Sequence, residues 1–312
     1  MFPLGNFLSI RLQQFLSEAI AKAGNAAVTS RGWWKRTFFN IPDEIFLDVR
    51  LLRGTLVDLD NSDVWRRPIG LLIRRAPTCN IRSDASYDSL GGWSETFQFC
   101  WRITTGELKS FGFATKLLNS GGQPDNIYDP AGLHINILEF VGVIINVWLL
   151  LWFVRRAPDK RGGHIAEVLA DNTSALSWMH YAARCHRPEV RHLAFFLQYL
   201  LTMSGTAAFL QVTGCHIPGV DSGPADALSR PRIYPTIVSA IAAYSQLQAC
   251  SIYRLPSELV SLIAEIIACS KIEVSLVQRM TRVLTLAPVT FVPGASGKEF
   301  SGVFQTLRRK PR

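Results

Sequence analysis

The sequence has no cysteine pair at the Cys-x-x-Cys spacing, and its six cysteines are scattered over 312 residues. Zinc fingers need closely spaced cysteine and histidine ligands, so we do not expect a structural zinc site. The dipeptides Cys185-His186 and Cys215-His216 lack that spacing and leave zinc as a minor alternative. A chain of this length can bury a core without disulfides, so we expect reduced, buried thiols.

Charged residues are scarce, at 18% of the chain, whereas apolar residues make up 48%. This composition is typical of a globular protein and excludes a disordered one. Acidic residues are fewer than basic ones: the chain has 24 Asp and Glu against 33 Lys and Arg, which gives a net charge of +9. The excess of positive charge favours an anionic partner, either nucleic acid or a membrane surface.

Residues 1–20 contain neither a basic n-region nor a small-residue cleavage site, so we expect no secretory signal and an intracellular protein, in the cytoplasm or the nucleus. The long apolar run, residues 140–154, is shorter than the ~20 residues that a membrane span needs. It also contains Asn146 and directly follows Glu139. We therefore expect a helix buried in a soluble core and no membrane partner, with a membrane segment as the distant alternative.

The first strands are predicted around residues 81–114. A buried strand begins at Ile81 and carries Asp84 near its end, a residue type that strands disfavour. A Ser/Asp/Gly turn follows, and Gly91-Gly92 is expected to make this hairpin tight. Alternating large side chains predict a second strand over 92–103, a turn over 104–107 and a third strand over 108–114.

The next elements alternate between helices and strands. The pattern predicts a helix from His134 to residue 154, a strand over 164–170, helices over 174–184 and 188–203, a strand over 206–212 and a short helix over 224–230 that Pro231 ends. Three consecutive strands indicate an antiparallel meander, whereas strands that follow helices indicate parallel crossovers. The expected fold class is therefore α/β, with a mixed sheet flanked by helices.

Two flanking segments extend this unit. Residues 1–80 are expected to contain an amphipathic helix over 7–23 and a cluster of aromatic and basic residues over 32–39. Residues 232–312 are expected to be mostly helical, with helices over 256–270 and 272–284 and a basic tail. The sequence alone leaves the role of the C-terminal segment open.

Four acids lie at strand ends and helix starts: Asp84, Glu139, Asp171 and Asp226. Each alone has a simpler interpretation, as a turn or helix cap or as charge in a first helical turn. In an α/β sheet, however, such positions converge on one rim. Four crowded carboxylates repel one another unless cations lie between them, and all-oxygen ligands favour Mg²⁺ or Mn²⁺. Two such ions would promote an in-line phosphoryl displacement.

Several segments resemble the successive motifs of the type 1 ribonuclease H domain of retroelement polyproteins, most closely the domain that follows the reverse transcriptase in DIRS-like elements. These are SDAS (83–86) with GGW (91–93), INILEF (135–140), LADNTSALSW (169–178) and HIPGVDSGPADALSRP (216–231). The resemblance covers residues 81–231 and implies a ribonuclease H-like mixed five-stranded sheet flanked by helices. Segments within residues 1–80 resemble the connection between polymerase and ribonuclease H, so this region is expected to be a remnant of it.

By the same resemblance, Asp84, Glu139, Asp171 and Asp226 are the catalytic, metal-binding acids, with Asp84 between two Mg²⁺ or Mn²⁺ ions. The implied reaction is hydrolysis of the RNA strand of an RNA–DNA hybrid, with one metal activating water and the other stabilising the leaving 3′ oxygen. Selectivity would come from hybrid shape and the RNA 2′-hydroxyl. The implied partners are the hybrid and the reverse transcriptase of the parent element.

The sequence also departs from that family. Many members have a histidine after the Pro-Gly of the last loop, where this chain has Val220; His216 precedes that turn and is interpreted as structural. The chain contains no Asp-Asp pair, so the polymerase site of a reverse transcriptase is absent. The main alternative is a catalytically silent remnant that folds and binds nucleic acid. A transposase or integrase of the same fold ranks lower, because its catalytic Glu comes last, whereas Glu139 is second here.

Overall fold

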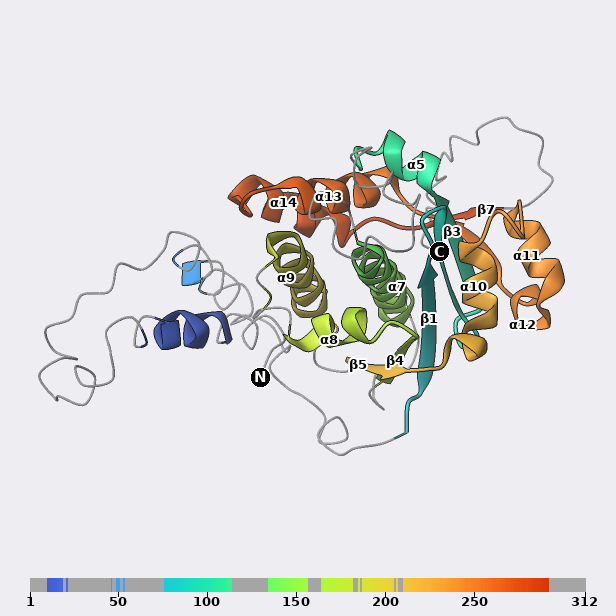
Figure 1. The fold of residues 1–312 in the computed structure, drawn as a ribbon, viewed down its shortest axis with the longest axis horizontal. Helices are drawn as coiled ribbons and strands as arrows, with labels where there is room; N and C mark the ends of the chain where they lie inside the picture. Colours follow the sequence, from blue (N-terminus) through green and yellow to red (C-terminus); the bar gives the residue numbers. More distant parts are fainter. Residues whose placement is uncertain are drawn as a thin grey trace, which may run out of the picture.

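The computed structural model describes residues 10–18, 21, 46, 49–50, 53, 76–113, 134–156, 164–181, 185, 187–204, 206 and 210–291. Over these residues the chain forms a mixed α/β structure, with a seven-stranded sheet between two groups of helices (Figure 1). Residues 10–18 are helical, within the predicted helix over 7–23. The predicted cluster over 32–39 and the basic C-terminal tail lie outside the described residues.

The strand order is β5-β4-β1-β2-β3-β6-β7. The meander prediction is confirmed, because β2 is antiparallel to both β1 and β3. The predicted parallel crossovers are also confirmed, because β4 is parallel to β1 and β5 is parallel to β4. The first five strands are β1 (Cys79–Ala85), β2 (Ser89–Ser94), β3 (Phe99–Thr104), β4 (His164–Ala170) and β5 (Leu210–His216).

The predicted bounds of the second and third strands are wrong. A turn at residues 95–98, where Gln98 has a φ of 49°, divides the alternating segment into β2 and β3. The predicted third strand is instead helix α5 (Thr105–Ser110). Thr104 accepts a hydrogen bond from the Glu107 amide and Glu107 accepts one from the Thr104 amide, a capping box that starts a helix where we expected a hairpin turn.

The sheet has seven strands, not the expected five. Strand β6 (Ser251–Arg254) pairs parallel with β3, and β7 (Val289–Phe291) pairs antiparallel with β6. Both strands are short and mostly exposed or half-buried, so they lack the alternation that would have predicted them. The segment after residue 231 therefore adds strands to the same sheet as well as helices.

Helices cover the two faces of the sheet unequally (Figure 1). On one face, α7 packs directly on β1 and β2, and α9 packs on α7. On the other face, α10 packs on β1 and β2, with α11 against it. The helices are α7 (Ile135–Arg156), α8 (Thr173–Tyr181), α9 (Pro188–Met203), α13 (Ser257–Ala268) and α14 (Val274–Val283) on the first face, and α10 (Gly223–Ser229), α11 (Ile237–Ala243) and α12 (Ser245–Gln248) on the second.

The long helix α7 is the centre of the larger core. It has the length and composition of a membrane-spanning helix, and 89% of its most apolar window is buried inside the protein. Its polar residue Asn146 is fully buried and bonds to the sheet, accepting from Trp101 Nε1 at 2.8 Å and donating to the Arg82 carbonyl at 2.7 Å. These bonds fix α7 against β1 and so set the position of Glu139 relative to Asp84.

Gly91 and Gly92 do not lie in the hairpin turn, as we had expected. Both are buried within β2, and the turn is formed by residues 86–88. A Cβ on Gly91 would collide with the α10 residue Leu228, and a Cβ on Gly92 would lie 2.5 Å from Asn146 Oδ1. The two glycines therefore let α10 and α7 approach opposite faces of the same strand.

Candidate metal centre

Three of the four predicted acids meet at one edge of the sheet. Asp84 is the penultimate residue of β1, Asp171 follows β4 directly, and Glu139 lies in the second turn of α7. Each offers a carboxylate oxygen, and these oxygens all lie within 4.8 Å of one another. Because β1 and β4 are parallel neighbours, their carboxyl ends bring Asp84 and Asp171 to the same edge.

Asp84 is almost fully buried, with 7% of its surface exposed. Its pKa is raised to about 6, chiefly by burial, and the charges of Asp171 and Asp226 act in the same direction. A hydrogen bond from Ser229 Oγ to Asp84 Oδ2 opposes that rise, because it stabilises the ionised carboxylate. Asp84 therefore gains a proton at a higher pH than an ordinary aspartate.

Glu139 is buried more deeply, with 4% of its surface exposed. Its Oε1 accepts a hydrogen bond of 3.0 Å from the Ala85 amide, whereas Oε2 is buried and has no hydrogen-bond partner. Burial, and then the charge of Asp84, raises the pKa of Glu139 to about 9. A carboxyl group in this setting is protonated at neutral pH unless a cation lies beside it.

The three acids fit a divalent cation. An unpartnered, buried carboxylate oxygen such as Glu139 Oε2 is costly unless it gains a partner, and two further carboxylates lie beside that of Glu139. The three acids offer only oxygen ligands, which suits hard cations such as Mg²⁺, Mn²⁺ or Ca²⁺. Burial, and then repulsion between the acids, raises the pKa of Asp84 and of Glu139, and a bound cation would oppose both effects.

Asp171 is half-buried and is the most accessible of the three acids. The backbone of Gly219, in the 3₁₀ turn η4 (Gly219–Ser222), lies against it, since a Cβ there would be 3.1 Å from Asp171 Oδ2. The next residue, Asn172, accepts from the Ala175 amide at 3.0 Å and so caps the start of α8. Asn172 also donates to Asn136 Oδ1 at 2.8 Å and so ties the end of β4 to the start of α7.

The fourth predicted acid, Asp226, lies outside this group. It is in the first turn of α10, as expected, but its Oδ1 pairs with Arg230 Nη2 at 2.5 Å, one helical turn along. Burial raises the pKa of Asp226, and Arg230 opposes that rise. The charge of Asp171 also raises this pKa, so Asp226 is near the acids although the structure does not bring its carboxylate into their group.

Ser229 is a site residue that the sequence analysis missed. It is fully buried, its hydroxyl donates to Asp84, and its carbonyl accepts from Ser86 Oγ at 2.6 Å and from Ser89 Oγ at 2.7 Å. These bonds join the end of α10 to the β1–β2 hairpin. The available signal was a pair of serines after Asp84, Ser86 in the turn and Ser89 at the start of β2, because serine hydroxyls commonly donate to backbone carbonyls.

Of the two loop positions singled out by the sequence, His216 precedes η4 and Val220 lies within it. His216 is the last residue of β5, is exposed, and is in register with Ala170, directly before Asp171. Val220 is 89% exposed, at the surface of η4. His216 is thus part of the strand ladder, in line with its structural interpretation.

No protein-family model, curated protein or solved structure matches this chain. Any function assigned to the acidic group therefore rests on its geometry and chemistry and on the sequence motifs.

Proposed function

We propose that this chain is a metal-dependent nuclease of the ribonuclease H type, which hydrolyses the RNA strand of an RNA–DNA hybrid. The observation that carries the proposal is the meeting of Asp84, Glu139 and Asp171 within 4.8 Å, with one buried carboxylate oxygen left unpartnered. The antiparallel meander followed by two parallel strands agrees with the fold that the sequence motifs imply.

In this proposal Asp84, Glu139 and Asp171 would hold the Mg²⁺ or Mn²⁺ ions that the resemblance implies. When bound, the ions supply an activated water and stabilise the leaving 3′ oxygen. The protein fixes the ligands beforehand, because the Ala85 amide holds Glu139 and Ser229 holds Asp84. Such preorganisation means that little rearrangement is needed when the ions and the substrate bind.

The role of Asp226 in this proposal depends on its ion pair with Arg230. Its carboxylate is engaged by Arg230, and both side chains are partly exposed, at 28% and 53%. An exposed ion pair of this kind contributes about 0.2–1 kcal/mol, so a nearby cation can compete for the carboxylate. Asp226 would then serve as a fourth ligand only when its ion pair with Arg230 opens.

The substrate class follows from charge and from the resemblance. A net charge of +9 suits a polyanion, and two-metal hydrolysis acts on a phosphodiester. Recognition by hybrid shape and by the 2′-hydroxyl is what the resemblance implies. The reverse transcriptase of a parent retroelement is the expected protein partner.

One observation favours a second candidate, a catalytically silent remnant that binds nucleic acid. The Arg230 guanidinium holds Asp226 outside the acidic group, so a site that keeps this pair closed would bind a metal with three ligands and fail to support turnover. The two candidates differ in activity and not in fold.

The test is cleavage of an end-labelled RNA–DNA hybrid by purified protein with Mg²⁺, beside an Asp84→Asn variant. Asp88→Asn is the matched control, because Asp88 lies in the adjacent turn and pairs with Arg232 at the surface. We expect wild type and Asp88→Asn to cut the RNA strand and Asp84→Asn to be inactive. Equal cleavage by all three proteins would refute the proposal. Cleavage by none of them would support the second candidate, a catalytically silent remnant.

A further inference from the structure

Arg102 is a half-buried cation on β3 that donates to three backbone carbonyls. Its Nε donates to the Leu228 carbonyl at 2.5 Å, its Nη2 to the Ala227 carbonyl at 2.8 Å and its Nη1 to the Tyr234 carbonyl at 2.8 Å. Two of these carbonyls belong to the last turn of α10, and the third belongs to the segment that follows this helix. A guanidinium suits this arrangement because its planar N–H groups point in fixed directions.

These hydrogen bonds complete the C-terminal end of α10. The last four carbonyls of a helix have no partner within that helix. Arg102 takes the carbonyls of Ala227 and Leu228, and two serine hydroxyls of the β1–β2 hairpin take that of Ser229. Without Arg102 the Ala227 and Leu228 carbonyls, which belong to buried residues, lose this donor, and we expect the last turn of α10 to loosen.

One row of the sheet joins Arg102 to the metal centre. Asp84 pairs with Gly91 on β2, and Gly91 pairs with Arg102 on β3, so the three residues lie side by side across three strands. Residues paired in this way direct their side chains to the same face of a sheet. Gly91 has no side chain, and the α10 residue Leu228 lies directly against it. The last turn of α10 therefore lies between Arg102 on one side and Asp84 on the other.

Ser229 is the residue through which α10 reaches the acids. Its hydroxyl donates to Asp84, and it directly follows Leu228, whose carbonyl accepts from Arg102. Arg102 and Asp84 are two strands apart, which is about 10 Å at the usual strand spacing. A contact between the two side chains is therefore replaced by a chain of two hydrogen bonds that passes through the end of α10.

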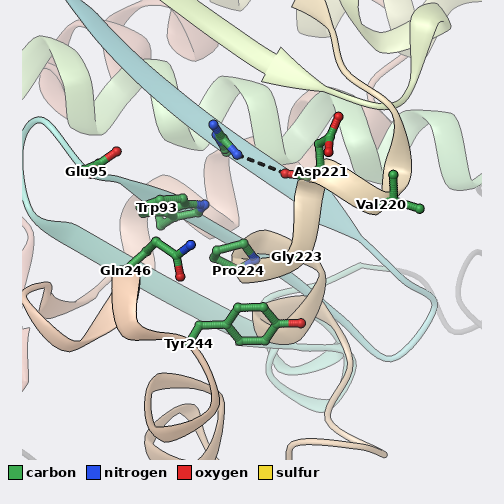
Figure 2. Close-up of a pocket in the computed structure, with 9 residues that line it drawn as sticks. Trp93, Glu95, Val220, Asp221, Gly223, Pro224, Tyr244 and Gln246 are labelled. Carbon is green, nitrogen blue, oxygen red and sulfur yellow. Dashed lines mark hydrogen bonds between the residues drawn. The ribbon is translucent and has the colours of Figure 1, made fainter.

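The start of α10 is held by a different arginine (Figure 2). Arg82 Nη1 donates to the Asp221 carbonyl in η4 at 2.9 Å, the dashed line in Figure 2. The Tyr244 ring lies against Gly223, the first residue of α10, where a Cβ would be 2.9 Å from Tyr244 Cε1. Loss of Arg102 is therefore expected to loosen the end of α10 near the acids and to leave its start attached.

We propose that Arg102 is a positioning residue of the metal centre, which fixes the last turn of α10 and so holds the Ser229 hydroxyl at Asp84. The hydrogen bond from Ser229 orients Asp84 for a cation. Removal of such a partner of a metal ligand commonly lowers metal affinity by about 10–100-fold, and Arg102 is one step further from the metal. The inference rests on the metal centre of the proposed function and not on its nuclease activity.

The direct test is calorimetric titration of Mn²⁺ into the full-length wild type and Arg102→Met at pH 7. Methionine keeps an apolar side chain and removes the donors, so we expect Mn²⁺ affinity to fall about tenfold. Arg102→Lys should recover only part of the loss, because a compact ammonium cannot span three carbonyls. Unchanged affinity in Arg102→Met would overturn the proposal. If that variant does not fold, Arg102→Lys takes its place in every comparison.

Arg155→Met is the matched control. Arg155 is also half-buried and also donates to backbone carbonyls, those of Leu151 at 3.2 Å and Leu284 at 2.6 Å. It lies towards the other end of α7 from Glu139, about 24 Å away at 1.5 Å per residue. We expect this variant to lower the urea midpoint, as Arg102→Met does, and to keep wild-type Mn²⁺ affinity. An equal loss of affinity in both variants would show a general effect of stability and contradict the proposal.

A double variant tests the path through Ser229. If Arg102 acts through this residue, Arg102→Met combined with Ser229→Ala should bind Mn²⁺ about as weakly as Ser229→Ala alone. Two losses that multiply, as those of independent sites do, would show that Arg102 does not act through Ser229.

Amide hydrogen exchange of the metal-free protein separates this inference from the proposed function. We expect Arg102→Met to exchange faster at the end of α10 and over residues 84–86, with β5 unchanged. Exchange that is unchanged at the end of α10 would refute the inference. Wild type that binds no Mn²⁺ would refute the metal centre, and the exchange would still decide whether Arg102 holds Ser229 at Asp84. Wild type that binds Mn²⁺ but cuts no hybrid would refute the nuclease and leave the inference standing.

Discussion

The most informative perturbation is Glu139→Gln, which replaces a buried acid with a neutral group of the same shape. The pKa of Glu139 is about 9 in the folded protein against an ordinary value of 4.5, so the folded state holds this proton across a pH range in which the unfolded chain loses it. The group therefore lowers the free energy of unfolding as pH rises from 4.5 towards 9. Below pH 4.5 both states are protonated and the effect vanishes.

The magnitude follows from the linkage. Each pH unit between 4.5 and 9 changes the free energy of unfolding by about 1.4 kcal/mol, so Glu139 lowers stability by about 3 kcal/mol at pH 7 relative to pH 4.5. Glutamine avoids this loss and can still accept from the Ala85 amide. Without metal at pH 7, Glu139→Gln should be the more stable protein by up to about 3 kcal/mol.

The assay is urea unfolding at pH 5 and pH 7, in EDTA and in Mn²⁺. We expect the advantage of Glu139→Gln in EDTA to be small at pH 5 and large at pH 7, and Mn²⁺ to stabilise wild type but not the variant. Glu258→Gln, in the exposed first turn of α13, is the control and should show neither effect. Equal stability of wild type and Glu139→Gln at pH 7 in EDTA would refute the reasoning.

Three further predictions concern the surroundings of the acids. Ser229→Ala removes the bond that lowers the pKa of Asp84, so Mn²⁺ affinity measured across pH should reach its midpoint at a higher pH than in wild type. Arg230→Met frees Asp226, so Mn²⁺ should bind more tightly by calorimetry, and a weaker affinity would show that Asp226 is no ligand. Gly91→Ala places a methyl group against α10, and its urea midpoint should fall by an amount equivalent to about 1–3 kcal/mol.

The sequence predicted the central elements well because their signals are local. The bounds of β4 and α9 agree with the prediction to the residue, since a polar turn follows the strand and Pro188 with Glu189 marks the helix start. The three acids were predicted for the same reason, because each lies near the end of a recognisable strand or near the start of a recognisable helix. Their convergence then followed from the parallel pairing of β1 with β4.

The failures have physical causes beyond local pattern. The sequence predicted one strand over 92–103 where the structure has β2 and β3. The turn between them, at residues 95–98, contains no glycine or proline to mark it. Strand β6 depends on pairing with β3, and β7 depends on pairing with β6, which no local sequence pattern predicts. The hydrogen bond from Ser229 to Asp84 joins residues far apart in sequence, so no local pattern predicts it. The ion pair with Arg230 competes with the metal-binding role that the position of Asp226 at a helix start had suggested.

The central claim, that Asp84, Glu139 and Asp171 form a metal centre, is tested most directly by calorimetric titration of Mn²⁺ into wild type and Asp84→Asn at pH 7. We expect wild type to bind Mn²⁺ and to release protons, because Glu139 is protonated without a cation and must ionise to become a ligand. Asp84→Asn should not bind in the same range. Binding by both proteins with equal affinity, or by neither, would contradict the claim.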